Sequence, residues 1–74
     1  MPNQTEWEMR AANLLKAELK RQGVTYAQLV VKLADIGISE KEVNVRNKLS
    51  RGKFSAAFML QCLSAIGATN LRLD

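Results

Sequence analysis

The chain has 74 residues, of which 47% are hydrophobic and 24% are charged, and its formal net charge is +4 at pH 7. This length allows one domain whose core is too small for a buried active site with its scaffold, and the composition excludes a disordered chain. The positive charge indicates an anionic partner, nucleic acid before a membrane surface.

The first predicted helix follows a frayed arm over residues 1–4. Thr5 and Glu8 have the spacing of a capping box, and the helix ends at Gly23. Glu18 falls by angle among leucines, so we expect it to pair with a cation or to lie at the edge of the apolar stripe. That stripe consists of Trp7, Ala11, Leu14, Leu15 and Leu19.

Two further capping boxes predict a pair of short helices. Thr25 with Gln28 opens a helix that ends near Gly37, and Ser39 with Glu42 restarts one after a turn of three or four residues. Two helices joined by a short turn that contains glycine are typical of a helix-turn-helix. The second helix should place these residues on one side: Leu29, Val30 and Leu33.

The third predicted helix, over residues 39–50, separates an inward stripe from a polar face. Five cations oppose two carboxylates between residues 40 and 53, so most of the net charge lies here. The inward residues are Ile38, Val45 and Leu49, and the outward ones are Val43, Asn44, Asn47 and Arg51, flanked by Arg46 and Lys48. Asn can bind an adenine edge, Arg a guanine or a phosphate, and Val a thymine methyl. The alternative is the solvated face of an ordinary amphipathic helix.

Ser55 can cap a last helix that is apolar almost all round and is closed by Gly67, which predicts a central core helix. The tail over residues 71–73 fits a β edge, a short helical turn or a docking arm, and exposed leucines there would favour self-association. We therefore expect an all-α fold: a compact bundle of four helices in a single domain over residues 1–74. The tail over residues 68–74 leaves open a short fifth element.

Catalytic and metal-binding chemistry is poorly represented. There is no histidine and one cysteine, and the glycines stand singly between helices rather than in a phosphate-binding loop. The acidic residues at positions 6 and 8, and at 40 and 42, diverge on a helix by roughly 200°, which does not suit a shared acid/base site. We expect no enzyme, no metal and no cofactor.

Cys62 excludes an intramolecular disulfide and favours a reducing compartment. Its neighbours Leu60 and Leu63 predict a buried thiol rather than a redox or covalent role. The longest apolar run is too short to span a bilayer, and the polar N-terminus does not resemble a signal peptide. We expect a cytoplasmic protein.

The order of a helix, the segment GVTYAQL, a turn, a capped polar helix and SRGK before an apolar helix resembles the Cro/cI (lambda-repressor-like) helix-turn-helix family of bacterial and phage regulators. The resemblance covers roughly residues 11–67, and NVRNKLSRGKFSAAFMLQCLSAIG also resembles a group of short bacterial proteins of unknown function in that superfamily. Positions that fit the family pattern are Thr25, Leu29, Arg51 and Gly52. The departures are Val30 in place of Ala, Ser50 in place of an acid, and a longer segment between Gly37 and Arg51.

The resemblance implies that the third helix enters the major groove while the start of the second meets the DNA backbone. The implied base contacts are Glu40, Val43, Asn44 and Asn47. The implied backbone contacts are Arg46, Lys48, Arg51, Lys53, Thr25, Tyr26 and Gln28. Alternatives remain: that Gln28 only caps its helix, that Tyr26 only covers the core, and that Lys53 is freely solvated.

We predict a DNA-binding helix-turn-helix protein, a small bacterial or phage transcriptional regulator that acts on double-stranded DNA as a homodimer. The alternative is a protein-interaction or dimerisation module with this shape and no DNA readout, because fold alone does not establish function. RNA binding is a third hypothesis, weakened because the few aromatic side chains mostly look buried: Trp7, Tyr26, Phe54 and Phe58.

Overall fold

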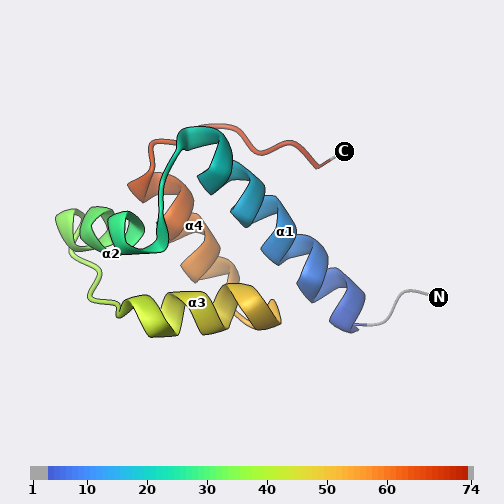
Figure 1. Ribbon diagram of the computed structural model, residues 1–74. Helices are drawn as coiled ribbons and strands as arrows, with labels where there is room; N and C mark the ends of the chain where they lie inside the picture. The colour runs from blue at the N-terminus through green and yellow to red at the C-terminus, as the bar shows by residue number, and fades with distance from the viewer. Residues whose placement is uncertain (1–3, 74) are drawn as a thin grey trace.

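The computed structural model describes residues 4–73, which form four helices and no strand. The helices are α1 (Gln4–Gln22), α2 (Tyr26–Asp35), α3 (Glu42–Arg51) and α4 (Ala56–Ala65). In Figure 1, α3 lies along the lower edge of the view, and it packs against both α1 and α2, while α2 also packs against α4. The predicted all-α bundle of four helices is confirmed.

One apolar cluster holds the helices together. Among the described residues, every helix contributes at least two buried side chains to this cluster: Leu15, Leu19, Leu29, Leu33, Val45, Leu49, Phe58, Cys62 and Leu63. Burying a side chain of this size stabilises the fold by roughly 1.5–3 kcal/mol. Helices of ten residues are marginal alone in water, so this shared face is what keeps α2, α3 and α4 helical.

Two of the predicted caps are present. At the start of α2, Thr25 Oγ1 accepts a hydrogen bond from the Gln28 N–H at 3.1 Å, and Gln28 Oε1 accepts one from the Thr25 N–H at 2.9 Å. At the start of α4, Ser55 Oγ accepts from the Phe58 N–H at 3.0 Å. These bonds satisfy amides that have no partner within the helix, so the sequence located both helix starts correctly.

The other two predicted caps are wrong. Helix α1 already includes Gln4, so Thr5 lies within the helix instead of at its cap; residues 1–3 of the predicted arm lie outside the described residues. Helix α3 begins at Glu42, and its N-cap Lys41 makes no side-chain cap hydrogen bond. The Ser39 box is therefore absent, because residues 38–41 are not helical and the backbone of Lys41 is extended.

The linker between α2 and α3 is correspondingly longer than predicted. It comprises residues 36–41 instead of three or four residues, and the third helix spans Glu42–Arg51 instead of residues 39–50. Within the linker, Ile38 packs against the core. That contact draws the chain along the core before the helix can start.

The apolar stripe of α1 is rotated from the predicted one. Leu15 and Leu19 are buried as predicted, but Trp7 is 53% exposed and Ala12 is fully buried instead. The reason is a close backbone contact between Gly52 and residues Glu8 and Met9, which turns the Ala12 side of α1 inward. The prediction of a buried Trp7 is therefore wrong.

Glu18 pairs with a cation, as predicted. Its carboxylate, on a residue only 8% exposed, forms an ion pair with Arg21 and accepts a longer hydrogen bond of 3.4 Å from Gln22 Nε2. The Arg21 hydrogen bond lowers the pKa of Glu18. The acid is thus kept ionised at the edge of the leucine stripe.

The tail fits one of its three predicted alternatives, whereas α4 departs from its prediction. Residues 68–73 form neither helix nor strand; Leu71 packs against the core, and Arg10 Nη2 donates a hydrogen bond of 2.9 Å to the Leu73 carbonyl. Of the three open alternatives, the tail is a docking arm that passes over the C-terminal part of α1 (Figure 1). Helix α4 buries Phe58, but Leu60 faces solvent, so it is not buried all round.

Candidate nucleic-acid interface

The outward face of α3 is polar and accessible. Val45 and Leu49 are fully buried, which orients the helix, and Val43, Asn44 and Asn47 are exposed on the opposite side. The predicted division of this helix into an inward stripe and an outward face is confirmed.

Gly52 ties the end of α3 to α1. Its backbone has φ +70, and a Cβ placed there would lie 2.5 Å from the Glu8 carbonyl oxygen. Only glycine combines this left-handed conformation with so close an approach. The Arg51-Gly52 sequence therefore has a structural cause, and it leaves the Arg51 side chain exposed at the end of the helix.

Glu40 and Lys48 pair with each other at the edge of this face. Lys48 Nζ lies 3.0 Å from Glu40 Oε2 and 4.3 Å from the centroid of the Phe58 ring. Glu40 was predicted to lie within the third helix, but the late start of α3 puts it in the linker. Lys48 lies one helical turn after Asn44, so the pair flanks the outward face, but its two charges are directed at each other.

Three other cations suit a polyanion better. Arg46 Nη2 lies 2.6 Å from Glu42 Oε2, and both side chains are open to solvent, so the pair is weak and can exchange partners. Arg51 and Lys53 are exposed and form no ion pair with another described residue. Positive charge thus gathers around the C-terminal end of α3.

The start of α2 supplies polar groups of a different kind. Thr25 and Gln28 are exposed, and each already makes the capping hydrogen bond described above, so Gln28 does cap its helix. Tyr26 is half-buried and packs against the core, so it does cover part of the core. The amide nitrogen of Gln28 takes no part in the cap.

Ser50 also belongs to the outward face of α3, although the sequence pattern was not interpreted in this way. It is exposed on α3. It lies three residues after Asn47 and seven after Val43, so it shares their face. Helical spacing alone would have found it. In the family pattern, Ser50 stands out only because it replaces an acidic residue.

The thiol of Cys62 is buried, as predicted. Cys62 is fully buried, and burial, reinforced by the charge of Glu40, raises the pKa of the thiol to about 12. Among residues 4–73, no three His, Cys, Asp or Glu side chains are grouped so that they could hold a metal ion. None of the described helices combines the length and apolar character needed to cross a membrane.

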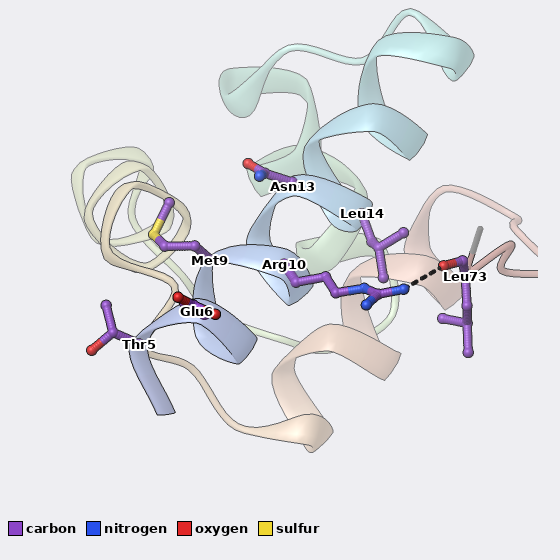
Figure 2. A pocket seen from close by; sticks show the side chains of 7 residues that line it. All are labelled: Thr5, Glu6, Met9, Arg10, Asn13, Leu14 and Leu73. Carbon is purple, nitrogen blue, oxygen red and sulfur yellow. Dashed lines mark hydrogen bonds between the residues drawn. The ribbon is translucent and has the colours of Figure 1, made fainter. Parts of the chain in front are cut away.

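A second surface lies between α1 and the tail. Figure 2 shows Arg10 reaching from α1 to the Leu73 carbonyl, with Leu14 beside it. The open groove there has a volume of about 500 Å³. Next to it the Arg10 guanidinium lies 5.3 Å from the centroid of the exposed Trp7 ring. Most of the accessible surface that lines this groove is apolar.

Comparison with curated proteins and with solved structures gave no significant match. A family model described as "Domain of unknown function (DUF6471)" matches residues 7–71, which include all of α2, α3 and α4 and most of α1. The chain therefore belongs to the DUF6471 family.

Proposed function

We propose that this protein binds double-stranded DNA with a sequence preference, as a small bacterial or phage transcriptional regulator. The observation that carries the proposal is the division of α3: its apolar side is fully buried, and Asn44 and Asn47 stand exposed on the other side, beside Arg51. Such a regulator would work in the cytoplasm.

The dimensions and chemistry of α3 suit the major groove. A helix with its side chains is roughly 10–12 Å across, and the groove is about 12 Å wide. The amides of Asn44 and Asn47 can read adenine, and Val43 can contact a thymine methyl. These three residues, with Ser50, are our proposed base-reading set.

Phosphate contacts would flank that set. We assign them to Arg46, Arg51 and Lys53 around α3, and to Thr25 and Gln28 at the start of α2. Glu40 and Lys48 leave the contact set, because each is occupied by the other. The resemblance to the Cro/cI family supports this docking, in which the second helix-turn-helix helix enters the groove.

Salt dependence tests the proposal most directly. The affinity of the full chain for duplex DNA should fall steeply with added salt, and Arg51→Ala or Lys53→Ala should each reduce the slope of log K against log[salt] by about 1. Lys32→Ala is the matched control, because Lys32 lies exposed near the opposite end of α2 from Thr25. A flat salt response of the unchanged protein would contradict DNA binding.

The surface between α1 and the tail favours a second candidate, a self-associating module without DNA readout. Trp7 and Leu73 are both exposed beside the groove, and exposed apolar groups of this size often mark an interaction site. Its expected occupant is a second copy of this chain.

Sedimentation equilibrium would test the second candidate. A dimer that dissociates in Trp7→Ala, combined with no duplex binding at low salt, would favour it over DNA binding. A dimer that also binds DNA fits the first proposal, because paired half-sites require two recognition helices.

A further inference from the structure

Backbone hydrogen bonds fix the first half of the linker before α3, but they do not fix the half nearest α3. The N–H groups of Ile36, Gly37 and Ile38 donate to carbonyls near the end of α2, at 2.8 to 3.1 Å. The N–H groups of residues 39–41 donate to no other described residue. The second half of the linker therefore depends on side chains for its position.

The first turn of α3 also lacks a cap of its own. Its N-cap Lys41 makes no side-chain hydrogen bond to the helix, so the free amides there have no partner among residues 4–73. Val43 and Asn44 belong to this turn. Two of the proposed base-reading residues thus lie on a helix start that would fray without support.

The Glu40–Lys48 pair supplies that support. The ion pair connects the linker to α3, and the contact of Lys48 with the Phe58 ring extends the connection to α4. Their side chains are 13% and 36% exposed, against 45% and 55% for Glu42 and Arg46. Water screens the Glu40–Lys48 pair less, so it constrains the chain more than the exposed pair does.

We propose that Glu40 and Lys48 are positioning residues that set the sequence preference of α3 without contacting DNA. The inference rests on the proposed DNA-binding function. It assigns to Lys48 a role opposite to that of Lys53. Lys53 neutralises phosphate for any sequence, while Lys48 keeps the base-reading turn in register and adds no phosphate contact.

The test compares Lys48→Met, Glu40→Gln, the double variant and Lys53→Met as control. Met keeps an apolar stem beside Phe58, and Gln keeps the shape of Glu40, so both variants should fold; circular dichroism checks this. With a selected DNA fragment and a scrambled one, the ratio of the two affinities should fall roughly three- to tenfold in each single variant. It should fall no further in the double variant, because one interaction has been removed.

The salt slope separates positioning from phosphate contact. Lys48→Met should keep the slope of the unchanged protein, while Lys53→Met should lose about 1 from the slope and keep the ratio between fragments. A Lys48→Met variant that loses slope as Lys53→Met does would overturn the inference, because Lys48 would then release Glu40 and bind phosphate.

Hydrogen exchange measured without DNA tests this inference independently of the proposed function. The Val45 N–H closes the first hydrogen bond of α3, with the Lys41 carbonyl at 3.0 Å. Its exchange should accelerate roughly three- to tenfold in Lys48→Met and in Glu40→Gln, and stay unchanged in Lys53→Met. Unchanged exchange in the first two variants would show that the pair does not hold the helix start. Absence of duplex binding by the unchanged protein would instead overturn the proposed function.

Discussion

Helices α3 and α4 each have ten residues, but they take opposite parts in this molecule. Helix α4 contains no charged residue and buries Phe58, Cys62 and Leu63. Helix α3 contains four charged residues and buries only Val45 and Leu49. Helix α4 therefore contributes mainly to the core, whereas α3 presents a polar side to solvent.

From this contrast we expect α4 to contribute mainly to stability and α3 mainly to the proposed DNA binding. Removing a side chain from the buried side of α4 should lower the free energy of unfolding. Removing one from the open side of α3 should leave stability nearly unchanged and alter binding. The same contrast also runs within each helix, since α4 exposes Leu60 and α3 buries Leu49.

The largest expected effect is at Phe58. Phe58→Ala should lower the free energy of unfolding by about 3–5 kcal/mol, because it leaves a cavity beside Phe54 and removes the ring under Lys48. Leu60→Ala is the control on the same helix; Leu60 is 66% exposed, and the change should be within about 0.5 kcal/mol. Urea unfolding measures both. An equal loss at Leu60 would mean that another chain covers this side of α4.

Gly52 should be the next most sensitive position. Gly52→Ala adds left-handed strain of roughly 1–2 kcal/mol and an overpacking cost of about 1–3 kcal/mol, because the new Cβ meets the Glu8 carbonyl. Gly23→Ala is the matched control, with φ +71 and no atom within 4 Å of the added Cβ. Thermal unfolding should rank the two variants in this order, and equal losses would contradict the close contact between α3 and α1.

Asn47 tests the open side of α3. Asn47→Ala should weaken binding to a selected DNA site by about 1–3 kcal/mol, with little effect on scrambled DNA, because the proposed bidentate base contact is lost. Asn13→Ala, at an exposed position on α1, serves as the control and should change neither affinity. Titrations with both fragments measure the effect. Equal losses on the two fragments would indicate that Asn47 does not read bases.

The smallest effect concerns the buried side of α4 and its thiol. Because the pKa of Cys62 is raised to about 12 from an ordinary 9.0, the unfolded chain loses the thiol proton first as pH rises. The thiol's contribution is therefore constant below about pH 9, and above it the free energy of unfolding should fall by roughly 1.4 kcal/mol per pH unit. Subtracting the pH profile of Cys62→Ala isolates this contribution. A flat difference between pH 9 and 10.5 would contradict burial of the thiol.

The candidate site was readable from the sequence only where it follows helical periodicity. The outward positions of Val43, Asn44 and Asn47 required only that Val45 and Leu49 face inward. The pairing of Glu40 with Lys48 was not predictable in this way, because it joins residues on different elements above a ring from α4. The spacing of cations along the sequence does not show whether a given cation is solvated or is paired with a carboxylate of the same protein.

The sequence by itself determined the all-α class, two of the four helix starts and the amphipathic division of α3. These features depend on local hydrogen bonds and on a period of 3.6 residues, both of which act within a few positions of the chain. Only the tertiary structure decided where α3 begins, which way Trp7 faces and how the tail docks. Those outcomes depend on contacts between distant segments, above all the close approach of Gly52 to Glu8 and the hydrogen bond from Arg10 to the Leu73 carbonyl. Such contacts cannot be predicted from the spacing of neighbouring residues.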